Sequence, residues 1–338
     1  MNFCRIYCHK SLDIGDGVML KKSLVFSLII ILIFFLSSMY LSKQIVDDIP
    51  VIKATEGEDH NFAIYTGDGD IIYTQSIDEI KRSLLNNVVV KAGSFVTSNP
   101  IGIIENSPKE RITDIKNLVL KSLDKENKVL IIYIDGLGYE LYEKAIYQGN
   151  VPYIASLNRG IRALTVYPPI TNVAFAAMVT GETPKYTGIQ SRDKKPLLAP
   201  TIFDAASKKG KTSKIIEGNI RILTSDVETI LNIDENNDGT IDDEIYRSAL
   251  EELKNPPHIL LVHFHSYDDM GHRYGPSSKE ALEQLKVLDL YIEDITKNFI
   301  GDIIITSDHG MHDEEGGGSH GNFLPMDLFI PIILENHK

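Results

Sequence analysis

Aspartate and histidine side chains gather in short motifs in the last quarter of the chain. Eight of the ten histidines lie there. The motif SYDDMGHRYGP contains Asp268 and His272, TSDHGM contains Asp308 and His309, and GGSHGN contains His320. Carboxylate and imidazole groups without a thiolate suit zinc, and also manganese or iron. Asp308 and His309 are adjacent and can reach one divalent ion, and Asp268 and His272 can hold a second. Glycines in these motifs permit the tight backbone turns that let the ligands converge.

Apolar runs that end on aspartate or histidine predict the strands that position these motifs. They are VLIIYID at 129–135, HILLVHFH at 258–265 and DIIITSD at 302–308, and FIPIIL forms one more strand near the end. Segments with helical spacing lie between them, at 201–210, at 278–299 and after Thr171. This alternation predicts an α/β fold with a central, mainly parallel sheet flanked by helices. In such sheets the site forms beyond the carboxyl ends of the strands.

Five motifs in this order resemble the alkaline-phosphatase superfamily, and most closely its type I phosphodiesterase/nucleotide pyrophosphatase branch. They are IDG at Asp135, PPITNVAFAAMVTG at Thr171, DxxGHxxGP at Asp268, SDHGM at Asp308 and HG at His320. The resemblance runs from about residue 129 to the end.

The resemblance implies two metal sites and a nucleophile. One metal ion would be held by Asp268, His272 and His320. The other would be held by Asp135, Asp308 and His309, with Thr171 as the nucleophile.

The chemistry of phosphate esters agrees with this assignment. Two metal ions about 4 Å apart can stabilise both the attacking and the leaving oxygen of an in-line displacement. A threonine hydroxyl is a poor nucleophile that metal coordination activates. We therefore expect Thr171 to form a phosphothreonine that water then hydrolyses, with net retention of configuration at phosphorus.

One position departs from the family pattern. Nucleotide pyrophosphatases carry a phosphate-binding asparagine beyond the nucleophile helix, where this chain has Ser191 and Arg192. An arginine can bind two phosphate oxygens at once, which suits a more highly charged group, although Arg192 also fits a charged surface loop. Asn172, beside the nucleophile, is a candidate substitute. A phosphomonoesterase or phosphonate hydrolase of the same superfamily is therefore the alternative to a phosphodiesterase. A sulfatase is disfavoured because the Cys/Ser-x-Pro-x-Arg signature is absent.

The segment DENNDGTIDDE resembles a calcium-binding loop. Asp234, Asn236, Asp238 and Asp242 match its positions 1, 3, 5 and 9, but position 12 is Ile245 instead of glutamate. A solvated acidic insert is the other interpretation. Together with a membrane anchor, the loop also permits a function of another class, a non-enzymatic, calcium-dependent surface binding protein.

Three further histidines lie close to the motifs. His263 and His265 alternate on one face of a predicted strand, and His312 follows the Asp-His pair. They could orient metal ligands. We expect His263 and His312 to be packed or solvated instead.

The N-terminal region predicts a membrane anchor. Residues 23–41 form an uncharged apolar run preceded by Lys21 and Lys22, which predicts a cytoplasmic segment 1–22, a single transmembrane helix and an exported remainder. A cleaved secretory signal is the alternative, and it exports the same chain. Residues 42–127 are expected to form a linker and a small accessory α/β region, with a hairpin at 61–74 and helices at 76–87 and 111–123. Residues 128–338 form the predicted catalytic domain.

Composition excludes several classes of protein. The formal charge of −13 disfavours sequence-independent nucleic-acid binding. Both cysteines, Cys4 and Cys8, precede the apolar run, so a cysteine-built metal site and a disulfide scaffold are excluded from the exported part. The expected partners are a phosphate-ester substrate and the membrane.

Overall fold

The computed structural model describes residues 29, 31–33, 49–54, 61–74, 88–91, 94–97, 100–193 and 196–337. Its largest element is a seven-stranded sheet in which the first five strands are parallel and β15 is antiparallel to both of its neighbours. This arrangement confirms the predicted α/β fold with a mainly parallel sheet. The strand order is β10 (Glu228–Leu231), β9 (Ser213–Glu217), β11 (Ile259–Phe264), β7 (Val129–Ile134), β12 (Gly301–Thr306), β15 (Phe329–His337) and β8 (Ile161–Leu164).

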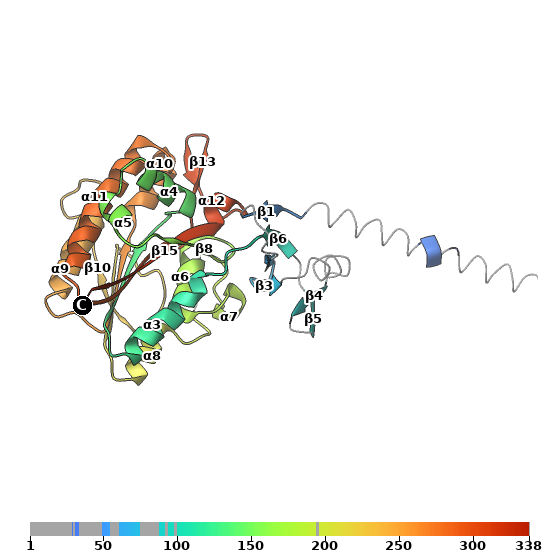
Figure 1. Cartoon of the computed structure of the whole chain (residues 1–338), viewed down its shortest axis with the longest axis horizontal. Helices are drawn as coiled ribbons and strands as arrows, with labels where there is room; N and C mark the ends of the chain where they lie inside the picture. The colour runs from blue at the N-terminus through green and yellow to red at the C-terminus, as the bar shows by residue number, and fades with distance from the viewer. Residues whose placement is uncertain are drawn as a thin grey trace, which may run out of the picture.

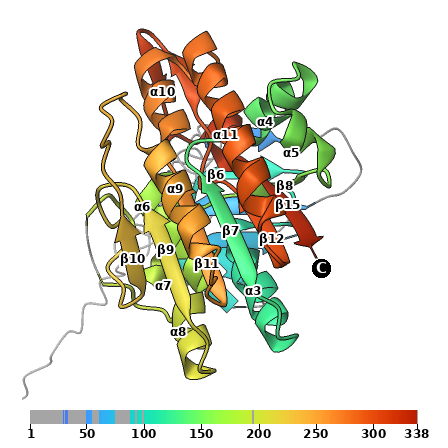
Figure 2. The same cartoon turned by 90° about the vertical axis from the view of Figure 1, so that its left-hand side faces the viewer.

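Both faces of the sheet are buried, which explains the continuous apolar runs of the central strands. On β7, Val129, Ile131 and Tyr133 enter one core, whereas the alternating residues Leu130, Ile132 and Ile134 enter the other. Figures 1 and 2 show helices covering each face. The first core is covered by α3 (Ile115–Asp124), α6 (Thr171–Thr180) and α8 (Ile202–Lys208), and the second by α4 (Tyr139–Tyr147), α5 (Pro152–Ser156), α9 (Asp242–Glu252) and α11 (Lys279–Lys297).

Short elements follow the carboxyl ends of the strands and carry the motifs. Helix α10 (Ser266–Tyr274) follows β11, and a hairpin of β13 (His312–Glu314) and β14 (Gly317–Ser319) follows β12. The remaining short helices are α7 (Pro184–Thr187), after α6, and α12 (Pro325–Leu328), directly before β15. The predicted helices at 201–210 and 278–299 correspond to α8 and α11.

A four-stranded sheet precedes the central one in the chain. Its order is β1 (Val51–Lys53), β6 (Pro100–Glu105), β2 (Phe62–Thr66) and β3 (Ile71–Thr74), so the predicted hairpin at 61–74 is confirmed as β2 and β3. Strands β4 (Val88–Lys91) and β5 (Ser94–Thr97) form a separate pair. The hydroxyl of Tyr65 donates to the carbonyl of Thr165 at 2.8 Å, and this bond joins the small sheet to the segment after β8.

Two helices were predicted before residue 128. The one at 76–87 lies outside the described residues. The one at 111–123 is confirmed as the turn η1 (Ile112–Asp114) followed by α3. Helix α3 packs against α6 and α8 over the central sheet.

The predicted membrane segment at 23–41 lies outside the described residues except for residue 29 and residues 31–33. Within the described part of the chain, no helix combines the length and the apolar character needed to span a bilayer. The anchor and the export of the chain stay predictions.

Candidate metal centre

The six predicted metal ligands come from separate segments that meet at the carboxyl edge of the central sheet. Asp135 directly follows β7, and Asp308 and His309 follow β12. Asp268 and His272 lie one helical turn apart on α10, so they face the same side of that helix. The ligand-forming atoms fall into one group of Asp135, Asp308 and His309 and another of Asp268, His309 and His320, each with its atoms within 4.8 Å of one another.

Asp308, a member of the first group, is fully buried and is fixed by hydrogen bonds. Its Oδ1 atom accepts hydrogen bonds from the backbone N–H groups of Gly136 and His309, at 3.1 and 2.9 Å, and from the hydroxyl of Ser307 at 3.2 Å. Its Oδ2 atom is buried, and none of the described residues donates a hydrogen bond to it. A buried carboxylate oxygen without a donor is costly unless a cation occupies the site.

The distances within this group match those expected around a zinc ion. His309 Nε2 lies 3.2 Å from Asp308 Oδ2 and 3.4 Å from Asp135 Oδ1. The hydroxyl of Thr171 lies 3.4 Å from the same nitrogen and 3.5 Å from Asp135 Oδ1. A tetrahedral ion with bonds of about 2.0–2.1 Å places its ligands about 3.3–3.4 Å apart. Four different side-chain atoms therefore meet at separations that suit one small cation.

Asp268 and His320 belong to the second group together with His309, whereas the predicted ligand His272 is not part of that group and contacts it at Asp268. His272 Nε2 lies 3.3 Å from Asp268 Oδ2, and His320 Nε2 lies 3.9 Å from Asp268 Oδ1, which is buried without a hydrogen-bond donor. The rings of His309 and His320 stack with centroids 3.8 Å apart, so the two groups adjoin.

The three predicted histidine ligands share one orientation. Nδ1 of His272, His309 and His320 lies 2.9–3.1 Å from the backbone carbonyl oxygens of Gly318, Gly310 and Pro169 respectively. A carbonyl oxygen only accepts, so Nδ1 carries a proton and Nε2 is the nitrogen that each ring would present to a metal ion. This is how metal-binding histidines are usually held in place.

The pKa values of Asp308 and His320 are shifted by burial and by the neighbouring carboxylates and imidazoles of the cluster. Burial, together with the charge of Asp135, raises the pKa of Asp308 to about 7. Burial and the neighbouring His309 lower the pKa of His320 to about 4, which leaves its imidazole neutral as a metal ligand requires. The side chains present fit divalent cations, and the six ligand roles stay a prediction.

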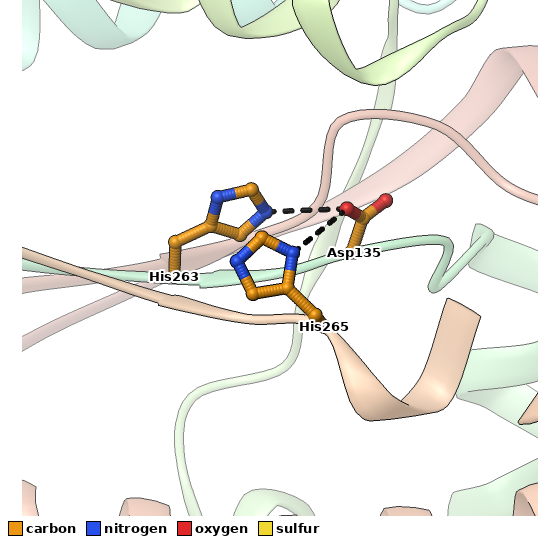
Figure 3. A group of neighbouring side chains, drawn as sticks. All are labelled: Asp135, His263 and His265. Carbon is orange, nitrogen blue, oxygen red and sulfur yellow. Dashed lines mark ion pairs between the residues drawn. The ribbon is translucent and has the colours of Figure 1, made fainter. Parts of the chain in front are cut away.

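Asp135 is also contacted from its other side, as Figure 3 shows. His263 Nε2 and His265 Nδ1 lie 3.3 and 3.6 Å from Asp135 Oδ2, and these three residues form a third group of possible ligands. His263 Nδ1 faces the buried carboxylate of Glu217 at 3.8 Å. His265 Nε2 accepts a hydrogen bond from the backbone N–H of Gly218, so its Nδ1 carries the proton that faces Asp135. This arrangement suits orientation of Asp135 better than metal binding.

The ionisation of His263 and Asp135 follows from their contacts with each other and with their neighbours. Burial opposes a charge on His263, but the negative charges of Asp135 and Glu217 outweigh it and raise the pKa of His263 to about 10. Burial likewise opposes ionisation of Asp135, yet the two histidines hold the pKa of its carboxyl well below the usual range.

Two expectations from the sequence are corrected here. His263 contacts a predicted ligand instead of serving only as packing, and His312 Nδ1 lies 2.7 Å from the buried carboxylate of Asp327. The contribution of Glu217 was missed altogether. It ends β9, whose segment SKIIE carries no motif, and only the three-dimensional pairing of β9 with β11 brings it to His263.

The two predicted substrate-binding residues lie at different places. The exposed Arg192 places Nη2 3.3 Å from His320 Nε2, at the edge of the second group. The side-chain amide of Asn172 donates to the carbonyl of Ile222 at 3.0 Å and so holds the loop after β9.

The calcium-like loop is only partly assembled. Asp234 accepts from the backbone N–H groups of Asp238 and Gly239, and Asn236 donates to Asp238 at 3.0 Å. Asp242 has a different role, because its two oxygens accept from the N–H groups of His265 and Ser266 at the start of α10. The fourth predicted calcium ligand is therefore occupied elsewhere, and its hydrogen bonds position the helix that carries Asp268.

Comparison with protein families matches residues 129–331 to the family described as type I phosphodiesterase / nucleotide pyrophosphatase. This match covers more than half of the chain and includes all six predicted metal ligands and Thr171.

Individual proteins are similar over shorter stretches or at lower identity. A GPI ethanolamine phosphate transferase 1 of Aspergillus oryzae is 32% identical over 104 residues, and one of Mus musculus is 35% identical over 95 residues. These alignments cover 27% and 26% of this chain, and they cover 10% of the length of each relative. The structure of a 2-O GAG sulfatase is 17% identical with a TM-score of 0.50, covering 62% of this chain and 64% of that one, and this likeness concerns the fold alone.

Proposed function

The chain belongs to the type I phosphodiesterase/nucleotide pyrophosphatase family, and on this basis we propose that it hydrolyses phosphodiester or pyrophosphate bonds through a phosphothreonine on Thr171. The observation that carries the proposal is the position of the Thr171 hydroxyl, 3.4 Å from His309 Nε2 and 3.5 Å from Asp135 Oδ1. A hydroxyl that shares a cluster of metal ligands is placed to lose its proton and attack.

Thr171 is the first residue of α6, and this position assists a negatively charged substrate. The backbone N–H groups at the start of a helix and the helix dipole favour an anion such as a phosphoryl group. Helix α6 is almost completely buried after its first turn, so the nucleophile is mounted on a rigid element.

The reaction proceeds in two displacements. The Thr171 hydroxyl loses its proton and its oxygen forms a bond to phosphorus, while the bond to the leaving oxygen breaks and that oxygen takes up a proton. Water then loses a proton as its oxygen displaces the Thr171 oxygen, which takes up a proton and becomes a hydroxyl again. Two bound divalent cations would supply positive charge for the phosphoryl oxygens and lower the pKa of the attacking groups. The side chains of Asp135 and His309 hold the Thr171 oxygen at the cluster.

Arg192 bears on the choice between diesters and monoesters. Its guanidinium group lies at the edge of the cluster, where a phosphoryl group bound at Thr171 would come within reach. A phosphomonoester or a phosphonate carries the additional charge that such a group stabilises. Contact between Arg192 and the phosphoryl group would favour the monoesterase or phosphonate hydrolase alternative, whereas the family match favours the phosphodiesterase.

A two-substrate assay tests the proposal. We expect the zinc-loaded full-length protein to hydrolyse bis-p-nitrophenyl phosphate faster than p-nitrophenyl phosphate, and Thr171→Ala to abolish both activities. The reverse order would select the monoesterase alternative. A chiral phosphate substrate that yields an inverted product would exclude the phosphothreonine.

Transfer to an alcohol is a second candidate, favoured by the similarity to GPI ethanolamine phosphate transferases. A phosphothreonine can be attacked by an alcohol in place of water. Product analysis with increasing glycerol as a model acceptor distinguishes the two, because a transferase forms the glycerol ester in excess of its molar share over water.

A further inference from the structure

The small sheet formed by β1, β6, β2 and β3 has no role in the reaction described above, yet it is bonded to the segment that leads to the nucleophile. Tyr65 on β2 is fully buried, and its hydroxyl donates to the carbonyl of Thr165 at 2.8 Å. Residues 165–170 connect β8 to α6, and α6 begins at Thr171. The hydrogen bond of Tyr65 therefore holds one end of the segment that places the Thr171 hydroxyl.

The segment 165–170 also holds one ligand from each of the two metal-ligand groups. The hydroxyl of Thr165 donates to the backbone carbonyl of Asp308, and Thr165 is fully buried. Near the other end of the segment, His320 Nδ1 donates to the carbonyl of Pro169 at 2.9 Å. One short segment thus contacts Asp308 and His320 and leads directly into Thr171. A shift of this segment would move the two metal-ligand groups relative to each other.

A second contact joins the small sheet to the loop that carries His320. Phe323 lies in this loop, and its ring meets the ring of Tyr65 edge to face with centroids 5.4 Å apart. Gly102 on β6 lies against the same ring, because a Cβ atom added at Gly102 would overlap the ring of Phe323. Glycine permits this close approach of the β6 backbone. Two strands of the small sheet therefore confine one ring of the His320 loop.

The small sheet is itself fixed by packing. Ala63, Tyr65 and Ile104 belong to the same buried core as Val129 and Ile131 of the central sheet. Protein interiors are densely packed and barely compressible, so a displacement on one side is transmitted to the other. The contacts of the small sheet therefore set where the segment 165–170 and the His320 loop lie.

We propose that the small sheet is a structural part of the metal centre and that Tyr65 is a positioning residue within it. The hydrogen bond from Tyr65 to Thr165 keeps Asp308, His320 and Thr171 at fixed separations. A functional site requires its side chains to be held within about 0.5 Å of the productive geometry. The part of the inference that concerns Thr171 rests on the proposed function, whereas the part that concerns the metal ligands holds for any reaction at this centre.

Tyr65→Phe tests the role of the hydroxyl, because it keeps the ring that packs against Phe323. The zinc affinity of the full-length protein is measured by competition with a chromophoric chelator, and kcat and KM are measured with bis-p-nitrophenyl phosphate. We expect zinc affinity and kcat each to fall roughly tenfold, the lower end of the loss for a residue that orients a metal ligand. KM should change less.

Tyr73→Phe, on β3 of the same sheet, is the matched control. The ring of Tyr73 packs against the guanidinium group of Arg111, and its hydroxyl bonds to none of the described residues. This substitution should leave zinc affinity and kcat unchanged. Gly102→Ala acts through the other contact, because it displaces Phe323, and it should lower zinc affinity without altering the Tyr65 hydroxyl. All variants are compared at a temperature where circular dichroism shows them to be folded.

The visible absorption spectrum of the cobalt-loaded protein separates positioning from stability. Cobalt bound in place of zinc absorbs according to the geometry of its ligands, which a loss of global stability does not change. The spectrum should differ from wild type in Tyr65→Phe and match it in Tyr73→Phe. An unchanged spectrum and zinc affinity in Tyr65→Phe, with only a lower melting temperature, would overturn the inference. If the wild-type protein hydrolyses no ester but Tyr65→Phe still changes zinc affinity and the cobalt spectrum, the positioning role stands and the proposed function fails.

Discussion

His263 Nε2 lies 3.3 Å from Asp135 Oδ2, whereas the Thr171 hydroxyl faces the other oxygen of the same carboxylate at 3.5 Å. His263 is fully buried, and its second nitrogen faces the buried Glu217. Asp135 is therefore fixed from one side so that its other oxygen points into the metal-ligand cluster. A carboxylate free to rotate would present either oxygen to a cation and would bind it less well.

His263→Gln should weaken the metal site without removing any predicted ligand. Losing a partner that orients a ligand typically costs 10- to 100-fold in metal affinity or activity, so we expect a fall of about this size in zinc affinity and in kcat, with a smaller change in KM. Zinc content by elemental analysis and steady-state kinetics measure the effect. His258→Gln, which changes the histidine at the amino end of the same strand, is the control. Unchanged zinc affinity in His263→Gln would show that the contact is only packing.

Thr171 should behave as a nucleophile in a matched pair of substitutions. Thr171→Ser retains the hydroxyl and should keep measurable activity, whereas Thr171→Ala should lose at least about a thousandfold in kcat, as removal of other catalytic nucleophiles does. Mass spectrometry of acid-quenched wild-type protein during turnover should find a phosphate group on the peptide that contains Thr171. Residual activity of Thr171→Ala close to wild type would exclude the covalent route.

The sequence predicted the parts of the centre that lie at strand ends. Asp135, Asp268 and Asp308 could be placed at one edge because an apolar run that ends on a carboxylate is a local signal and parallel strands share their carboxyl edge. The structure confirms the parallel arrangement of β7, β11 and β12 on which this reasoning depends. The antiparallel direction of β15 could not be foreseen, since a buried strand reads as the same apolar run in either direction.

The surroundings of the ligands had no local signal. Glu217 and Asp242 come from β9 and α9, and each contacts the strand or helix of another motif only after the sheet has formed. The spacing of Asp242 fits either a calcium loop or a solvated acidic insert, but its carboxylate accepts hydrogen bonds from the backbone at the start of α10. Spacing along the chain cannot distinguish a loop ligand from a helix cap contributed by a distant segment.

The stabilisation that Asp308 gives the metal-free protein should decrease as the pH rises. Burial and Asp135 raise the pKa of Asp308 from 3.8 to about 7. Because the folded state holds this proton more tightly than the unfolded state, the stabilisation is complete below pH 3.8 and disappears as the pH rises through about 7. Relative to Asp308→Asn, the melting temperature of the metal-free protein should therefore fall between these values.

Zinc should reverse this loss, because a cation takes the place of the proton and metal binding releases it. In differential scanning fluorimetry, the rise in melting temperature on exchanging EDTA for zinc should grow from pH 5 to pH 8. A zinc-induced rise of equal size at every pH would contradict a buried, protonated Asp308 in the metal-free state.

Asp242→Ala should destabilise the protein and weaken the second metal site together. The Asp242 carboxylate accepts from the N–H groups of His265 and Ser266 at 2.9 and 3.0 Å, and it is fully buried. Removing an acceptor at a helix N-terminus costs about 0.5–2 kcal/mol of the free energy of unfolding. Because two buried donors would be left unpaired, we expect a loss of about 2 kcal/mol. Because α10 carries Asp268 and His272, zinc affinity should fall as well.

Urea unfolding and zinc titration measure the two effects. Asp238→Ala, in the exposed calcium-like loop, is the control and should change neither by a comparable amount; equal effects of the two substitutions would mean that the loop, and not the cap, supports the helix.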